Sequence, residues 1–301
     1  MKPIYETGII HIDVTNACNM TCSNCSRFVG HHTKTFLMDL ETVEKALKSL
    51  KGFPGKVGLM GGEPTIHPDF YEICKLYQKY IPDKNKRGLW TNGMNWDKYE
   101  DIIKETFFYK DIVYNDHTEP EAVHQSLLVA AKDVVEDEKY MWELIDNCWI
   151  QDRWSASITP KGAFFCEVAA AQDYLFDGPG GYDLEEGWWN KEVSEFQDQV
   201  KDFCGNCGAA VPMPRIKSQE NYELVSSSVQ EKLSKASNTR VASGKKIELF
   251  THVFSKEEIE NEISKGWTPW SHRPFKQVGP NKFLDKDGNV VDRKIIVTAY
   301  E

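Results

Sequence analysis

Short apolar runs and amphipathic segments alternate along the first 130 or so residues of the chain. Residues 8–14 form an Ile- and Val-rich run that is typical of a buried strand. Apolar residues then recur at helical spacing over 40–50, in a helix that Asp39 can cap and Gly52 can end. The same alternation predicts further strands at 56–60, 87–90 and 111–114, and further helices at 68–80, 96–106 and 121–135. Repeated strand–helix units of this kind predict an α/β fold with parallel strands.

The loops that follow the predicted strands carry the polar residues of chemical interest. They are 18–25, 61–64, 91–93 and 115–117. In α/β barrels and open α/β sheets, the carboxyl ends of the strands form the site. We therefore expect these four loops to surround one active site.

The first of these loops contains three cysteines, Cys18, Cys22 and Cys25. Three thiols in one tight loop are typical of a soft-metal site, and iron–sulfur clusters normally take four ligands. One coordination position is thus left for another molecule. The alternatives are a zinc knuckle that also uses His31 and His32, or three buried free thiols.

This spacing resembles the signature of the radical S-adenosylmethionine (radical SAM) enzymes. In that family three cysteines hold a [4Fe-4S] cluster whose open iron binds SAM. The segment Gly61-Gly62-Glu63-Pro64 resembles the family's GGEP segment, which holds the SAM amino group, and Thr91-Asn92-Gly93 resembles a sequence that often ends a later barrel strand. The family often has an aromatic residue before the third cysteine, where this chain has Asn24.

The resemblance implies an incomplete (β/α)6 TIM-like barrel, followed by a small cysteine-rich α+β domain and a C-terminal extension. It implies a cofactor-binding set with members in three loops. These are Gly61, Gly62, Glu63, Thr91, Asn92 and Asn115.

A second group of four cysteines follows, Cys148, Cys166, Cys204 and Cys207, with a turn glycine and a short strand before Cys166. The group resembles the twitch or SPASM-like domain, which binds an auxiliary [4Fe-4S] cluster. Four thiolates leave no open iron, so such a cluster is suited to electron transfer. A four-thiolate zinc site is the alternative.

We divide the chain into three regions. Residues 1–147 form the barrel, with about 158 as the furthest limit of its last strands. Residues 148–211 form the auxiliary-cluster domain, and residues 212–301 form an extension of unknown role. In the extension, the pattern predicts a helix at 226–236, a strand at 246–254, a helix that Ser255 and Glu258 cap, and a hairpin over 281–284 and 289–298.

The resemblance implies that SAM is cleaved reductively to a 5′-deoxyadenosyl radical, which removes a hydrogen atom from a substrate. We favour dehydrogenation, with the auxiliary cluster as electron acceptor and a base that takes a proton. Asp116 and His117 are the leading candidate bases, with His124 and Asp152 behind them.

Other outcomes stay open. Epimerisation needs a thiol that returns hydrogen, and only Cys74, on a predicted core helix, is uncommitted. Elimination or carbon-skeleton chemistry on a sugar, nucleotide or peptide-derived substrate is another course. From a different class, the alternative is a non-catalytic zinc or iron–sulfur binding or electron-transfer protein.

Composition narrows the setting of this chemistry. The net charge of −10 gives no indication of general nucleic-acid binding, and no apolar run is long enough for a membrane span. Seven of the eight cysteines fall into metal-type groups and no signal peptide is evident, which favours the cytoplasm. The expected partners are a small-molecule or peptide substrate and an external one-electron reductant such as flavodoxin or ferredoxin.

Overall fold

The computed structural model describes residues 1–115, 117, 122–153, 156–236, 246–265, 267, 276–279, 282–284 and 289–292. Its main sheet has six strands in the order β4-β3-β2-β1-β6-β7. The strands are β1 (Ile9–Asp13), β2 (Lys56–Met60), β3 (Arg87–Thr91), β4 (Ile112–Tyr114), β6 (Ala156–Thr159) and β7 (Gly162–Phe164). All neighbours are parallel except β6 and β7. The α/β prediction is confirmed, and the sheet is open.

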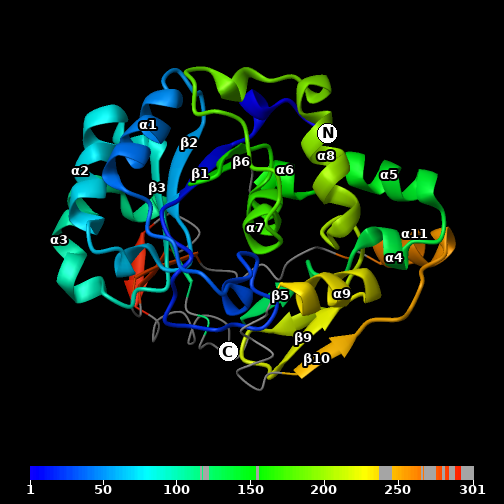
Figure 1. Ribbon diagram of the computed structural model, residues 1–301. Helices are drawn as coiled ribbons and strands as arrows, with labels where there is room; N and C mark the ends of the chain where they lie inside the picture. The colour runs from blue at the N-terminus through cyan, green and yellow to red at the C-terminus, as the bar shows by residue number, and fades with distance from the viewer. Residues whose placement is uncertain are drawn as a thin grey trace.

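Three amphipathic helices connect the first four strands and lie together on one side of the sheet (Figure 1). They are α1 (Leu40–Ser49), α2 (Phe70–Tyr80) and α3 (Trp96–Thr106). Asp39 caps α1 by accepting a hydrogen bond from the Thr42 amide, as predicted. The apolar face of the sheet is fully buried through residues such as Ile10, Ile12 and Leu59. Burial of these side chains anchors β1 in the middle of the sheet.

Most of the helices after residue 122 lie on the side of the sheet opposite to α1–α3, toward β6 (Figure 1). Its helices are α4 (Ala131–Val134), α5 (Glu138–Asp146), α6 (Ile150–Arg153), α7 (Glu167–Leu175), α8 (Gln197–Phe203), α9 (Ser227–Lys235) and α11 (Lys256–Ser264). Its other strands are β5 (Val123–Gln125), β8 (Arg215–Lys217), β9 (Tyr222–Val225) and β10 (Lys246–Leu249). β5 pairs with β8, and β10 pairs with β9.

One prediction of secondary structure is wrong in this half, and another holds only in part. The predicted helix at 121–135 is instead β5 followed by the single turn α4, and residue 121 lies outside the described residues. Pairing of Val123 with Lys217 imposes the strand, because a contact between distant segments overrides local propensity. The predicted strand at 246–254 ends earlier, at Leu249.

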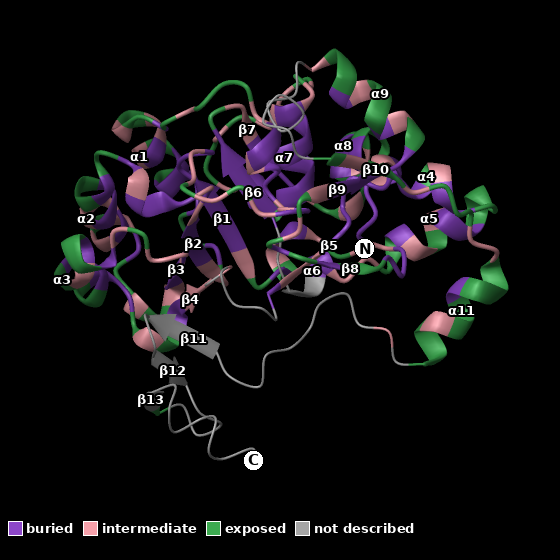
Figure 2. Ribbon diagram, turned by 90° about the horizontal axis from the view of Figure 1, so that it is seen from below, coloured by how far each residue is buried: buried purple, intermediate pink, exposed green. Residues whose placement is uncertain are grey.

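The described part of the tail forms an antiparallel sheet of β11 (Lys276–Gly279), β12 (Lys282–Leu284) and β13 (Val290–Asp292). β11 lies against β4, at the edge of the main sheet. Further into the sheet, β1 and β2 are buried along most of their length (Figure 2). The predicted hairpin is confirmed over 282–284 and 290–292, and 293–298 lies outside the described residues. The capping box of Ser255 and Glu258 is also confirmed. Within the described ranges, no helix is long and apolar enough to cross a membrane.

Candidate active site

One face of the main sheet is polar. Strand register places His11 in one row with Gly58 and Ser157, and Asp13 follows two residues later on the same face. The His11 ring packs edge-on against Trp90, with centroids 4.5 Å apart. A Cβ on Gly58 would lie 2.4 Å from the His11 ring, so this glycine makes room for the histidine. The polar row ends at the carboxyl ends of the strands, where the predicted site loops begin.

The cysteine loop is held against the Gly61-Gly62 segment by backbone contacts. The Gly62 amide donates to the Thr15 carbonyl at 2.7 Å, and the Glu63 amide donates to the Ala17 carbonyl at 2.7 Å. A Cβ on Gly61 would lie 2.2 Å from the Thr15 oxygen, and one on Gly62 would lie 2.2 Å from the Ala17 oxygen. Only glycine allows this approach, which positions the chain immediately before Cys18.

The Glu63 carboxylate joins two of the predicted loops, 61–64 and 91–93. It is fully buried, and its Oε1 accepts hydrogen bonds from the Thr65 amide, the Thr65 hydroxyl and the Thr91 hydroxyl at 2.6 to 3.0 Å. Its Oε2 accepts from the Asn92 amide at 2.6 Å. The Asn115 amide donates to the Thr91 carbonyl at 2.7 Å, so Asn115 lies beside the same loop. The six predicted cofactor-binding residues are therefore neighbours.

Asn92 extends this group to the first cysteine. Its side-chain amide donates to the Asn19 side chain at 2.8 Å and lies 3.5 Å from the Cys18 sulfur. Burial, which outweighs the opposing hydrogen bond from the Met20 amide, raises the pKa of Cys18 to about 12, with smaller contributions from Cys25 and Glu63. A thiolate here therefore needs a nearby positive charge, such as a bound metal.

All three cysteines of this loop are thiols of intermediate burial. Asn24, between Cys22 and Cys25, adopts a left-handed conformation with φ of 52°, which asparagine tolerates well. Its side-chain amide donates to the Ser23 hydroxyl at 2.8 Å. The three-thiol set and its neighbouring polar loops fit a cluster with one open position.

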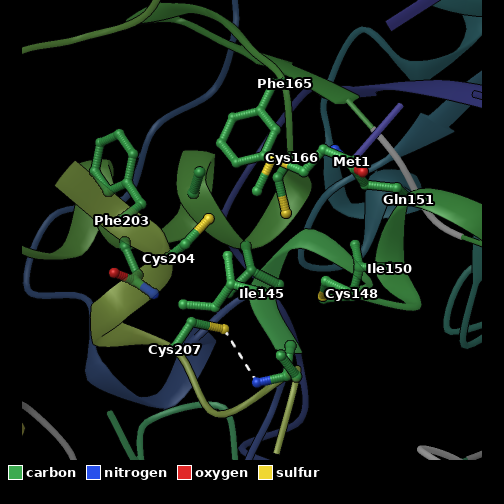
Figure 3. A pocket seen from close by; sticks show the side chains of 15 residues that line it. Met1, Ile145, Cys148, Ile150, Gln151, Phe165, Cys166, Phe203, Cys204 and Cys207 are labelled. Atoms are coloured by element: carbon green, nitrogen blue, oxygen red, sulfur yellow. Dashed lines mark hydrogen bonds between the residues drawn. The ribbon is translucent and has the colours of Figure 1, made fainter. Parts of the chain in front are cut away.

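The four cysteines of the second group line one cavity (Figure 3). Cys148 lies between α5 and α6, Cys166 precedes α7, and Cys204 and Cys207 flank the short turn after α8. The rest of the wall is mainly apolar, with Ile145 and Phe203 among its members. Local folding thus brings together the three segments that the sequence predicted.

The electrostatics of this cavity suit a cationic or soft-metal guest. Burial raises the pKa of Cys166 to about 12, and burial together with neighbouring thiolates holds the pKa of Cys204 and Cys207 well above the usual range. The Ala209 amide donates to the Cys207 sulfur at 3.4 Å. No three His, Cys, Asp or Glu side chains of the described chain converge closely enough to hold one metal ion. The thiols surround a space rather than a point.

The structure describes some of the candidate bases and not others. Asp116 and the side chain of Asp152 lie outside the described residues. The rings of His117 and His124 lie 4.7 Å apart, and His124 Nδ1 is 2.8 Å from the Ser23 carbonyl oxygen in the cysteine loop. Cys74 is fully buried in the core on α2. Two of the candidate bases thus lie beside the first cysteine group.

Sequence reasoning missed four buried residues that contact one another: His11, Asp13, Arg27 and Glu167. The alternation of His11 and Asp13 with isoleucines in β1 was a signal, because strand side chains alternate between faces. Arg27 lies two residues after Cys25, and Glu167 directly follows Cys166. No local pattern indicates that these two make contact.

Residues 12–114 match the radical SAM superfamily, and the chain carries a radical SAM domain. This match covers the first cysteine loop, the Gly61-Gly62-Glu63 segment and the Thr91-Asn92-Gly93 segment. Over residues 12–114, the match bears out the resemblance seen in the sequence. Proteins of this superfamily use a [4Fe-4S] cluster and SAM.

Curated relatives match part of the chain. GTP 3′,8-cyclase of Chlorobaculum tepidum is 31% identical over 97 residues, which are 32% of this chain and 29% of the relative. GTP 3′,8-cyclase of Alkaliphilus metalliredigens is 28% identical over 110 residues, 35% of this chain and 34% of the relative. A 7,8-dihydro-6-hydroxymethylpterin dimethyltransferase of Methanocaldococcus jannaschii is 33% identical over 73 residues, 23% of this chain and 14% of the relative.

The chain thus spans about a third of the length of the two cyclases. Among solved structures, BtrN in complex with AdoMet and 2-DOIA aligns with a TM-score of 0.43 and 17% identity. That alignment covers 67% of this chain and 92% of BtrN.

Proposed function

We propose that the chain is a radical SAM enzyme that dehydrogenates an organic substrate and uses two iron–sulfur sites. The observation that carries this proposal is the presence of two separate thiol sets of different size. Cys18, Cys22 and Cys25 lie beside the loops of Glu63 and Asn92, whereas four other thiols line their own cavity. Three ligands leave a position for SAM, and four ligands complete a site.

The first site would hold a [4Fe-4S] cluster on Cys18, Cys22 and Cys25, which with SAM supplies the 5′-deoxyadenosyl radical for hydrogen-atom removal. The chain's own residues shape its surroundings. Glu63 fixes the Asn92 backbone, and Asn92 directs its side-chain amide toward Cys18 and Asn19. Gly61, Gly62, Thr91 and Asn115 hold these loops in place, and the proposed SAM site lies among them.

The second site would hold an auxiliary [4Fe-4S] cluster on Cys148, Cys166, Cys204 and Cys207, which supplies an electron acceptor. A cavity between the thiols suits a multi-atom cluster better than a single zinc ion. Its apolar wall excludes water, which favours electron transfer over hydrolytic chemistry. The region 148–211 then acts as a twitch-like domain.

Dehydrogenation balances when the substrate loses one hydrogen atom, one electron and one proton. The proton needs a base near the first site. His117 is our candidate, with Asp116 beside it in the sequence, and the contact between the His117 and His124 rings supports it. His124 reaches the cysteine loop through the Ser23 carbonyl. An imidazole is suited to accept a proton near neutral pH.

The proposed substrate is a small organic or peptide-derived molecule. The names of the relatives suggest a nucleotide or a pterin, and a sugar or a peptide-derived molecule is the other choice. An external one-electron reductant such as flavodoxin or ferredoxin would supply an electron to the first cluster. Thiol-rich sites of this kind favour a reducing compartment, which agrees with a cytoplasmic location.

The test is anaerobic reconstitution of the chain, followed by measurement of bound iron and of SAM cleavage with dithionite. We expect about eight irons per chain and production of 5′-deoxyadenosine. Screening candidate substrates for deuterium transfer into 5′-deoxyadenosine would then identify the substrate. Bound zinc without SAM cleavage would contradict the enzyme assignment and favour a structural metal protein.

The Cys204→Ala variant separates the two sites. We expect it to lose the auxiliary cluster and to keep SAM cleavage while yielding no oxidised product. The matched control is Cys74→Ala, because Cys74 is a buried core thiol that belongs to neither group. Oxidised product from Cys204→Ala at the wild-type rate would contradict the electron-acceptor role.

A further inference from the structure

A buried ionic cluster lies on the polar face of the main sheet. Arg27 Nε is 3.2 Å from Asp13 Oδ2, and Arg27 Nη2 is 2.8 Å from Glu167 Oε2. His11 Nδ1 lies 3.1 Å from the same Glu167 oxygen, and the Ser157 hydroxyl donates to Asp13 at 3.1 Å. The exposed fraction of each charged side chain is 5% or less. Charges this deeply buried are retained at a cost in desolvation, which calls for a reason.

The position of the cluster in the chain supplies such a reason. Arg27 follows Cys25 by two residues, and Glu167 directly follows Cys166. The Arg27–Glu167 ion pair therefore joins the first cysteine loop to the first turn of α7, which carries a cysteine of the second group. The two segments are 140 residues apart in the sequence, and a bidentate-capable guanidinium is the side chain best suited to fix them in one geometry.

The electrostatics agree with this arrangement. Burial would lower the pKa of Arg27, but Asp13 and Glu167 raise it above its usual range, and Cys25 adds to this effect. Burial would raise the pKa of Glu167, but Arg27 and His11 lower it to about 2. The ion-pair geometry points the same way, with the Arg27 guanidinium 3.2 Å from Asp13 and 2.8 Å from Glu167. Arg27 Nη1 and Glu167 Oε1 are buried and have no hydrogen-bond partner in the described structure. The ionic cluster therefore has one donor and one acceptor that can still form hydrogen bonds with neighbouring groups.

We propose that Arg27 is a positioning residue that couples the two iron–sulfur sites, by fixing their relative placement and by raising the reduction potential of both. This proposal rests on the proposed two-site function. Each cluster gains negative charge on reduction, so a buried cation nearby favours the reduced form. Arg27 is two residues from Cys25 and forms an ion pair with Glu167, the neighbour of Cys166, so its charge acts on both sites. A residue that contacts the ligands of one site alone would act on that site only.

The experiment is a redox titration of the reconstituted full chain, monitored by electron paramagnetic resonance. Addition of SAM identifies the signal of the first cluster, because only that site has a position for it. We expect Arg27→Met to lower the midpoint potentials of both clusters, since two carboxylates then face them without the cation. The double variant Arg27→Met/Glu167→Gln loses one cation and one carboxylate, and both potentials should return toward the wild-type values.

Two further variants keep the test decisive if Arg27→Met does not fold. Arg27→Lys retains the charge, so its potentials should stay close to those of the wild type. Glu167→Gln removes a negative charge, and it should raise both potentials. The matched control is Lys161→Met, because Lys161 forms a 2.8 Å ion pair with the buried Asp173, also on α7, seven residues beyond Cys166. That variant should change neither potential.

The outcomes separate this inference from the proposed function. A wild-type chain that binds only about four irons would overturn the two-site proposal, and the coupling with it. About eight irons with a shift at one cluster alone, in either Arg27→Met or Glu167→Gln, would overturn the coupling and leave the two-site proposal intact. Equal shifts in the Lys161→Met control would also overturn it, because the effect would then be a general consequence of disturbing α7.

Discussion

At the scale of single residues, the first cysteine loop depends on two missing side chains. Gly61 and Gly62 let two backbone segments approach within hydrogen-bond distance just before Cys18. The sequence motif predicted that these glycines belong to the cofactor-binding set, but it did not predict that they allow the two backbone segments to approach. In the structure they support the loop, and any contact with a cofactor is additional to that support.

Replacement of Gly62 by alanine tests this role. Its Cβ would lie 2.2 Å from the Ala17 carbonyl oxygen, and backbone must move to relieve the overlap. We expect a loss of about 1–3 kcal/mol in the free energy of unfolding and reduced iron at the first site. Urea unfolding and iron analysis measure these effects. Gly8→Ala is the control, since nothing lies within 4 Å of its added Cβ; equal losses in the two variants would refute the explanation.

At the scale of elements, the cysteine loop also depends on helix α7. His32, which follows the short turn Val29–His31, packs edge-on against Tyr174 of α7, with ring centroids 5.5 Å apart. Its Nε2 lies 2.9 Å from the Arg27 carbonyl oxygen. Burial lowers the pKa of His32 to about 4. Between about pH 4 and pH 6.5, the imidazole is therefore neutral in the folded protein and protonated in the unfolded chain.

This difference predicts a specific loss of stability in acid. The unfolded chain binds an extra proton at His32 below about pH 6.5, whereas the folded chain binds it only near pH 4. Stability should therefore fall as the pH decreases through this window, by at most about 3 kcal/mol from this residue. Urea unfolding of wild type and His32→Gln at pH 7 and pH 4 measures the contribution as a difference. An identical pH dependence in both proteins would exclude His32 as its source.

The elements also show where prediction from sequence works and where it stops. Helices α1 to α3 were predictable because each carries its own apolar stripe, and α1 its own cap. Strand β5 was mistaken for helix because its partner β8 lies about ninety residues further along the chain. The Arg27–Glu167 contact was missed for the same reason. Local sequence patterns predict local structure, but they do not indicate which distant segments come into contact.

At the scale of the whole molecule, the segment after residue 211 is part of the support of the first site. The Ser23 amide, in the cysteine loop, donates to the Ser218 carbonyl at 2.8 Å, and the Ser23 hydroxyl donates to the Tyr222 carbonyl. Val225 and Val229 are buried in the same apolar cluster as Phe28 and Cys207. The division into regions 1–147, 148–211 and 212–301 stays a prediction, but the third region has a structural role in its first part.

Two truncations test that role. A chain ending at residue 265 keeps the strands β8 to β10, α9 and α11, and with them both hydrogen bonds to Ser23. A chain ending at residue 217 loses those bonds and uncovers the apolar cluster around Phe28. Phe28 is only 1% exposed in the full chain, so the truncation would expose apolar surface to water. We expect the longer chain to load iron at both sites and the shorter chain to lose iron at the first. Full iron content in the chain ending at 217 would show that the cysteine loop holds its shape without the extension.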